Sequence, residues 1–228
     1  ATNWPEALRA AYEPVSCLSA SETGGIFLVS RRAEGMKGIL RISVGQASED
    51  AAAEYRILGQ LNDPRIPQAL FFQEEEGRGY LVRQYMEGQT LREYVEIHGI
   101  LSEKEIIDIA LSTCDILSLL HNQSPPIIHR DIKPENIIIA PDGGIRLVDF
   151  GIARVFRENA TSDTVAIGTR PYMAPEQFGG TQTDARSDLY SLGVVMIFLA
   201  TLKHDRTNIG QRYPYAGLAP IVSRLVKA

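Results

Sequence analysis

The stretch from His129 to Gly151, HRDIKPENIIIAPDGGIRLVDFG, constrains this chain more than any other part of it. Asp131 is placed where it could accept a proton from a hydroxyl group, and Lys133 could neutralise a transferring phosphoryl group. Asn136 and Asp149 offer the hard oxygen ligands that Mg²⁺ prefers. Such groups are costly to bring together unless something binds them, so the stretch predicts a metal–phosphate site rather than a charged turn buried for stability.

Three short motifs here resemble those of the protein kinase family. The pattern H-R-D-x-x-x-x-N is met at residues 129–136, D-F-G at 149–151 and A-P-E at 174–176. Their order and spacing match the family, and Lys133 is typical of its serine/threonine branch. The resemblance covers nearly the whole chain, from about Tyr12 to Ala228, and is to the eukaryotic-like serine/threonine protein kinases in their bacterial style.

The resemblance implies an α+β, bilobal protein-kinase-like fold. Residues 1–86 would form an antiparallel β-rich N-lobe that binds nucleotide, and residues 87–228 a mainly α-helical C-lobe that carries the catalytic loop and activation segment. The late Arg that pairs with Glu176 in the family is not evident, so we expect the family domain to continue past residue 228.

Apolar periodicity and turn residues agree with a β-rich first part and a helical second part. The expected strands cover residues 15–18, 26–29, 38–44, 68–73 and 80–84. The expected helices cover a short segment after Pro5, residues 49–61, 184–202 and 218–227, and two segments that open with the capping boxes Thr90 to Glu93 and Ser102 to Glu105. In a capping box, a hydroxyl and a carboxylate satisfy free backbone N–H groups.

The family roles imply phosphoryl transfer from ATP, with Mg²⁺, to Ser or Thr of protein substrates, together with autophosphorylation. Asp131 would orient and deprotonate the acceptor hydroxyl, while Lys133 and the Mg²⁺ held by Asn136 and Asp149 would stabilise the transition state. Thr169 matches a substrate-loop position that bonds the catalytic Asp and Lys.

Two further features of the C-lobe follow from the resemblance. Thr161, Ser162 and Thr164 lie in a polar stretch of the activation segment and are phosphorylation candidates, with Arg130 as the expected receiver of the phosphate. The alternative, that these three are only mobile loop hydroxyls, stays open. Asp188 matches a buried helix Asp that braces the backbone of the catalytic loop.

The N-lobe departs from the family in its glycine-rich loop. The resemblance assigns nucleotide contacts to Ser19, Ser21, Gly24, Ile26, Ile39, Arg41, Glu54, Gln84, Met86 and Ile138. Glycines let backbone N–H groups approach phosphates closely. Of the three glycines in the family pattern only Gly24 is present, because Ser19 and Ser21 replace the other two.

Three more departures lie around the expected phosphate-binding cation. Arg41 stands where the family has a Lys, and we expect it to pair with Glu54, since the alternative cation, Lys37, would need a register shift. Ile39 replaces a smaller residue and would narrow the adenine pocket. Arg83 occupies a usually apolar position and needs a partner there, which could be Glu54 or the phosphates.

Composition bounds the class of protein. The formal net charge of −5 disfavours a nucleic-acid or membrane-surface role. Two cysteines, Cys17 and Cys114, are interpreted as small core hydrophobes in a reducing compartment, so we expect a cytoplasmic location. The longest apolar run, Leu192 to Leu202, is too short to span a bilayer, although a membrane anchor outside this sequence stays open. The oligomeric state stays open as well.

Two alternative functions stay open. The departures in the N-lobe are consistent with a pseudokinase that acts as a regulatory binding module. A small-molecule kinase of related fold is the third hypothesis. The activation segment and the A-P-E motif argue against it, because they build a platform for protein substrates.

Overall fold

The computed structural model of this chain describes residues 4–21, 24–156, 168–178, 182–203, 220–222 and 225. They belong to two compact units, Ala1–Met86 and Glu87–Ala228. The phosphorylation candidates Thr161, Ser162 and Thr164 lie outside the described residues, as does most of the helix expected at 218–227.

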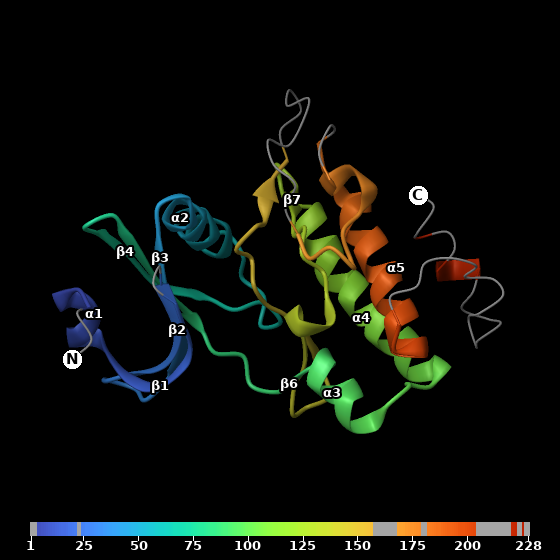
Figure 1. The fold of residues 1–228 in the computed structure, drawn as a ribbon, viewed down its shortest axis with the longest axis horizontal. Helices are drawn as coiled ribbons and strands as arrows, with labels where there is room; N and C mark the ends of the chain where they lie inside the picture. Colours follow the sequence, from blue (N-terminus) through green and yellow to red (C-terminus); the bar gives the residue numbers. More distant parts are fainter. Residues whose placement is uncertain are drawn as a thin grey trace. The chain divides into compact units, whose positions relative to one another are not determined.

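An antiparallel sheet with strand order β1-β2-β3-β5-β4 forms the first unit (Figure 1). Its strands are β1 (Tyr12–Ser21), β2 (Gly24–Arg31), β3 (Lys37–Val44), β4 (Ala69–Glu75) and β5 (Arg78–Gln84). Helix α1 (Glu6–Ala11) precedes the sheet, and helix α2 (Gln46–Leu58) follows β3. The sequence predicts each of these elements, but β1 runs further than its apolar pattern, so that Ser19 and Ser21, at the glycine-rich-loop positions, lie in the strand.

Side-chain alternation in β3 sends neighbouring residues to opposite faces of this sheet. Leu40 joins the buried cluster that contains Trp4 and Leu8, next to α1. Arg41 instead faces α2, where it pairs with Glu54. One face is therefore an apolar core, and the other carries charges at its centre.

The cysteine interpretation was wrong for Cys17. Its side chain is exposed on β1, while Cys114 in the second unit is half-buried. The residues of β1 from Glu13 to Ser21 are all exposed, and β1 is an edge strand of the sheet. Periodicity shows the two faces of a strand, but it does not show which strand lies at an edge.

Helices and several short strands form the second unit (Figure 1). Among the described residues, its helices are α3 (Leu91–His98), α4 (Glu103–His121) and α5 (Ala185–Thr201), and residues 220–222 are helical as well. The strands β6 (Gln89–Thr90), β8 (Ile137–Ile139) and β9 (Ile145–Leu147) form one sheet, and β7 (Ile127–Ile128) pairs with β10 (Arg154–Val155). In the part of the chain that the structure describes, 3₁₀ turns lie at Pro134–Asn136 and Pro175–Phe178. The two units together confirm the predicted α+β class.

Both predicted capping boxes are present. Thr90 accepts from the backbone N–H of Glu93, whose carboxylate accepts from the N–H of Thr90, and Ser102 and Glu105 repeat this arrangement at the start of α4. Helix α5 is nearly all apolar and nearly all buried from Ser191 to Ala200, as expected of a core helix. Among the described residues, no helix combines the length and apolarity that crossing a membrane requires.

Gly24 is required by close packing, which yields a testable prediction. A Cβ added to it would overlap the backbone carbonyl oxygen of Ile42 in β3. We expect Gly24→Ala to cost about 1–3 kcal/mol, because the two strands must shift apart. Thermal unfolding measures this cost as a lower melting temperature. Gly144→Ala is the control, since the nearest atom to its new Cβ belongs to the flexible side chain of Asp142. Equal melting temperatures for the two variants would contradict the prediction.

Candidate active site

Asp131 sits in the loop after β7, and the side chains of Lys133 and Thr169 are among those that contact its carboxylate. Lys133 Nζ lies 2.6 Å from Oδ2, and Thr169 Oγ1 donates to Oδ1 over 2.8 Å. Lys133 also donates to Thr169 Oγ1 over 2.9 Å. Asp131, Lys133 and Thr169 thus form a closed, hydrogen-bonded set. Thr169 makes both of the bonds that the resemblance to the kinase family implies for it. The arrangement places an acceptor carboxylate, a cation and a hydroxyl within contact of one another.

Asn136 ends the 3₁₀ turn that follows this loop, and its side chain is oriented by Asp131. Its amide nitrogen donates to the backbone oxygen of Asp131 over 2.9 Å and to the carboxylate Oδ2 over 3.0 Å. Because the nitrogen makes both bonds, the amide oxygen is the atom that points away from Asp131. A side-chain oxygen in a buried position is thereby presented in a defined direction.

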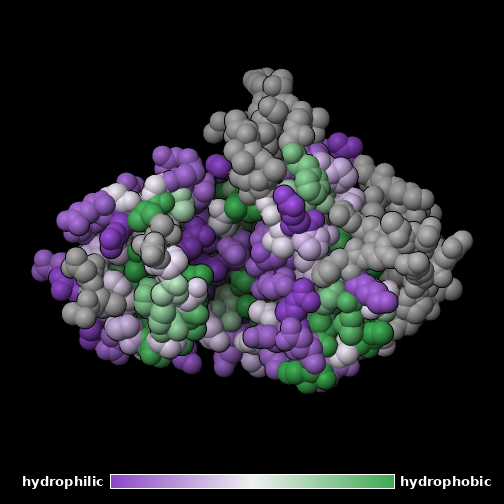
Figure 2. Space-filling model, viewed as in Figure 1, coloured by the Kyte–Doolittle hydropathy of each residue, from purple (hydrophilic) through white to green (hydrophobic). Residues whose placement is uncertain are grey.

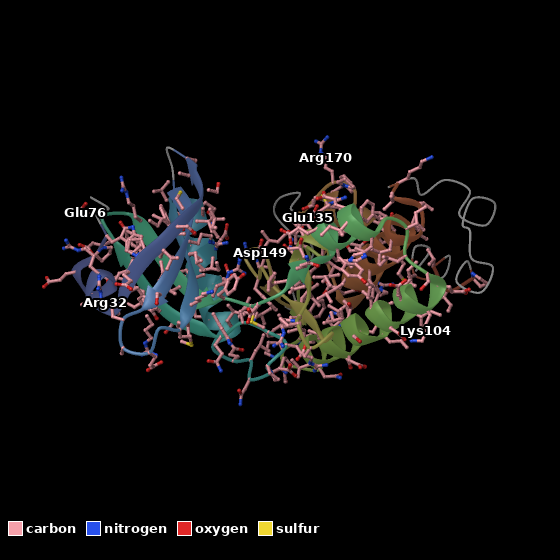
Figure 3. The ribbon with its side chains drawn as sticks, turned by 90° about the horizontal axis from the view of Figure 1, so that it is seen from below. Arg32, Glu76, Lys104, Glu135, Asp149 and Arg170 are labelled. Atoms are coloured by element: carbon pink, nitrogen blue, oxygen red, sulfur yellow. The ribbon has the colours of Figure 1, made fainter. Side chains whose placement is uncertain are left out.

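Asp149 comes next to Asn136 through the short β8–β9 ladder. Ile137 pairs with Leu147, and the N–H of Val148 donates to the backbone oxygen of Asn136 over 2.9 Å. Asp149 has φ +67°, a conformation uncommon outside glycine and found where surrounding structure enforces it. Asp149 follows β9 in the chain and is labelled in Figure 3.

The residues present fit a magnesium ion. Mg²⁺ is held in proteins by one or two carboxylates, with water and substrate phosphates as its other ligands. The Asn136 amide oxygen and the Asp149 carboxylate supply such a partial set. Within the described residues, no group of three or more His, Cys, Asp or Glu side chains is placed to hold a metal ion by itself. The chemistry of the donors therefore suits an ion that shares its coordination with a phosphate.

A fully buried carboxylate, that of Asp188 in α5, braces the backbone of this loop. The backbone N–H of His129 donates to Oδ2 over 2.9 Å, and that of Arg130 donates to Oδ1 over 2.7 Å. His121 Nε2 lies 2.8 Å from Oδ2. Arg130 has φ +69°, which turns the loop so that the two successive N–H groups converge. The predicted structural role of Asp188 is confirmed.

Gln177 is a supporting residue that the sequence analysis missed. Its amide nitrogen donates to the backbone oxygen of Arg130 over 2.7 Å, and its amide oxygen accepts from the N–H of Ala174. It thus joins the catalytic loop to the A-P-E motif that it directly follows. The neighbouring Glu176 accepts a hydrogen bond from Ser187 Oγ over 2.6 Å. Glu176 therefore has a partner, although the Arg that pairs with it in the family is not evident in the sequence.

A charged cluster in the first unit contains the predicted pair of Arg41 and Glu54. Arg41 Nη2 lies 2.9 Å from Glu54 Oε2, and the Glu54 side chain is only 1% exposed. Arg83 Nη1 lies 3.6 Å from the other carboxylate oxygen, so Arg83 has Glu54 as one of its partners. Lys37 is exposed at the start of β3, with its Nζ 5.9 Å from the Tyr85 ring centroid. Glu54 therefore pairs with Arg41 and not with Lys37.

The other residues assigned to the nucleotide lie in both units. Ile39 is directly opposite Arg83 in the β3–β5 register. Ser19 and Ser21 are exposed on β1, and Gly24 opens β2. Gln84 ends β5, where its side-chain oxygen accepts from the backbone N–H of Gln68. Met86 is buried at the end of the first unit, and Ile138 is in β8 of the second.

Apolar surface appears over β1 and β2 in Figure 2, where Val15, Leu18 and Ile26 are exposed.

The comparisons with known proteins show the family of this chain. A family model described as the protein kinase domain matches residues 30–211. The chain therefore belongs to the protein kinase family.

Its curated relatives include bacterial serine/threonine kinases. It is 37% identical over 160 residues to a probable serine/threonine-protein kinase PknB of Bifidobacterium longum, covering 65% of this chain and 23% of that protein. It is 41% identical over 125 residues to serine/threonine-protein kinase PknB of Mycobacterium tuberculosis, covering 54% and 20%. A probable serine/threonine-protein kinase of Clostridium perfringens is 34% identical over 149 residues, covering 65% and 22%. The matched region spans about a fifth of the length of these relatives.

His129 is fully buried and held in one tautomer. Its Nδ1 accepts from the N–H of Asp131 and its Nε2 donates to the backbone oxygen of Val148, each over 3.3 Å. Its ring packs edge-on against Phe150 with centroids 4.8 Å apart. Burial lowers the pKa of His129 from its ordinary value of 6.5, although nearby carboxylates, first Asp188, act in the opposite direction. The folded chain therefore contains a neutral His129.

This lowered pKa makes stability depend on pH. The unfolded chain takes up a proton near pH 6.5 that the folded chain binds only at lower pH, so the free energy of unfolding should fall below pH 6.5. The loss is at most about 1.4 kcal/mol per pH unit. Denaturant unfolding between about pH 7.5 and 5.5 measures how steeply the free energy of unfolding depends on pH. His129→Phe should flatten this slope, whereas the control His98→Gln, at an exposed position, should keep it. Equal slopes for wild type and His129→Phe would refute the prediction.

Proposed function

We propose that this protein transfers the γ-phosphoryl group of ATP to Ser or Thr hydroxyls of protein substrates. The observation that carries the proposal is the hydrogen-bonded set of Asp131, Lys133 and Thr169. It combines a carboxylate that can take a hydroxyl proton with a cation beside it. The kinase domain match and the serine/threonine kinase relatives support the same reaction.

In the proposed reaction, the substrate hydroxyl binds at Asp131 in place of one present contact, such as that of Thr169. Its oxygen attacks the γ-phosphorus, the bond from that phosphorus to the β-phosphate oxygen breaks, ADP leaves, and the hydroxyl proton passes to Asp131. Lys133 neutralises charge on the transferring group. Mg²⁺ held by Asn136 and Asp149 would supply charge neutralisation at the phosphates. Most of the acceleration would come from positioning and electrostatics.

For the nucleotide, we assign the α- and β-phosphates to Arg41. A guanidinium keeps the charge of the family Lys and offers a planar fork of donors. Glu54 holds this fork in place through the 2.9 Å ion pair. Since Arg83 also pairs with Glu54, two cations share one buried carboxylate, and the cluster has a formal net positive charge that suits phosphate. In the same unit, Ile39 and Ile26 would contact the adenine.

The two alternatives differ in what they bind. In the pseudokinase hypothesis, the replaced glycines and Arg41 have removed productive ATP binding, and the chain acts as a regulatory module. In the small-molecule kinase hypothesis, the acceptor is not a protein. The bonds of Thr169 to Asp131 and Lys133 favour a protein substrate, because they place the segment that leads into the A-P-E motif beside the catalytic residues.

Catalysis can be tested by intact-protein mass spectrometry after incubation with Mg-ATP. We expect added phosphate in the wild type and none in Asp131→Asn, which keeps the size of the side chain but cannot accept the proton. Phosphate mapped to Thr161, Ser162 or Thr164 would support autophosphorylation of the activation segment. No phosphate on either protein, with a general protein kinase substrate also unmodified, would favour the pseudokinase.

Nucleotide binding can be tested separately by calorimetric titration with ATP, with and without Mg²⁺. Arg41→Met should weaken Mg-ATP binding about tenfold or more, because a charge-assisted contact to phosphate is lost. Arg56→Met is the matched control, since Arg56 is exposed on α2 and donates to the backbone oxygen of Ala52. No detectable binding to the wild type at millimolar ATP would contradict the assignment of Arg41.

A further inference from the structure

Arg92, near the start of α3, connects three parts of the second unit. Its Nε donates to Glu135 Oε1 over 2.9 Å, and its Nη2 donates to the Tyr172 hydroxyl over 3.2 Å. The guanidinium carbon also lies 4.3 Å from the centroid of the Phe198 ring in α5. The capping box at Thr90 sets the start of α3 and so the position of Arg92. No family motif identified in the sequence includes this residue.

Both hydrogen-bonding partners of Arg92 lie close in the chain to the candidate catalytic residues. Glu135 belongs to the turn between Lys133 and Asn136. Tyr172 is joined to Thr169 by a turn in which its N–H donates to the Thr169 backbone oxygen over 2.9 Å. Residues of an extended peptide follow one another every 3.3 Å or so. A protein substrate whose hydroxyl lies at Asp131 therefore brings its neighbouring residues near Glu135.

Glu135 would attract basic side chains if it were unpaired. Its side chain is 42% exposed, and its second carboxylate oxygen, Oε2, is buried without a hydrogen bond among the described residues. Removing the guanidinium would therefore leave a carboxylate with free acceptor capacity. Arg170, which follows Thr169, is exposed and points outward from this unit (Figure 3), so it adds positive charge near Thr169.

The guanidinium of Arg92 is already ordered by its surroundings. Its side chain is 27% exposed and is contacted by Glu135, Tyr172 and Phe198. Burial raises the pKa of Tyr172, so the phenol stays protonated and its oxygen accepts from Arg92. A substrate arginine would have to lose side-chain entropy to replace this contact, whereas Arg92 has lost it on folding. The intramolecular pair is therefore favoured over a pair with substrate.

We propose that Arg92 is a specificity-determining residue. By pairing with Glu135, it keeps this carboxylate from binding basic residues of protein substrates, so that the preferred substrates have neutral or acidic residues around the acceptor hydroxyl. The inference rests on the proposed function for the identity of its ligand, a protein segment carrying a hydroxyl acceptor. It goes beyond that function by naming the substrate class and the residue that selects it.

The test uses two fluorescent peptides that share one serine and differ only in the residues flanking it, arginine in one and glutamine in the other. Their Kd values are measured by anisotropy, and their kcat/KM values with Mg-ATP. The wild type should not favour the arginine peptide. Arg92→Met keeps an unbranched side chain against Phe198. It should raise the affinity and the kcat/KM for the arginine peptide about fivefold relative to those for the glutamine peptide, as expected for one newly available ion pair. The double variant Arg92→Met with Glu135→Gln should lose this gain.

The single variant Glu135→Gln tests the same pair from the other side. It leaves the charge of Arg92 uncompensated, so the arginine peptide should bind about threefold more weakly relative to the glutamine peptide. This variant decides the outcome if Arg92→Met does not fold.

An unchanged ratio in Arg92→Met, or a gain that persists in the double variant, would overturn the inference. The inference would also be overturned if the wild type bound neither peptide. If Arg92→Met does not fold, an unchanged ratio of the two peptide affinities in Glu135→Gln would overturn it. A wild type that binds the peptides without phosphorylating them would refute the proposed function alone, because the Kd ratios still test the role of Arg92.

Discussion

The catalytic loop depends on the buried carboxylate of Asp188. This carboxylate accepts from two successive backbone N–H groups, those of His129 and Arg130, at the point where the chain adopts a positive φ. A left-handed conformation costs a residue with a side chain about 1–2 kcal/mol. Hydrogen bonds to a charged acceptor are worth about 1.5–3 kcal/mol each and can offset that cost. The direction of the Asp131 side chain follows from the loop shape that Asp188 enforces.

Polar contacts from separate parts of the chain converge on the same loop. His121 at the end of α4 contacts Asp188, and Gln177, after the A-P-E motif, bonds the backbone oxygen of Arg130. Both sides of the Arg130 peptide backbone are thus satisfied by side chains, as buried polar groups require. Because these contacts are shared, the loop, α4, α5 and the segment around the A-P-E motif constrain one another.

Much of the fold and of the catalytic set could be predicted from local patterns. The capping boxes at Thr90 and Ser102 depend on residues three positions apart, and both are present. The strands of the first unit follow from apolar runs and turns, although β1 extends past its apolar part. Contacts made by long side chains between distant segments were harder to predict. Gln177 and Arg92 were missed, because nothing in their own neighbourhoods shows which carbonyl or carboxylate folding will bring to them.

The sequence by itself determined the family, the α+β class, the Asp131–Lys133–Asn136 arrangement and the pairing of Arg41 with Glu54. Motif spacing and strand alternation are local properties, and a linear sequence records them. Only the tertiary structure decided that Arg83 shares Glu54, that Cys17 lies on an exposed edge, and that Arg92 occupies Glu135. These features depend on which strand is at the edge of the sheet and which helix packs beside the loop, and packing of the whole unit decides both.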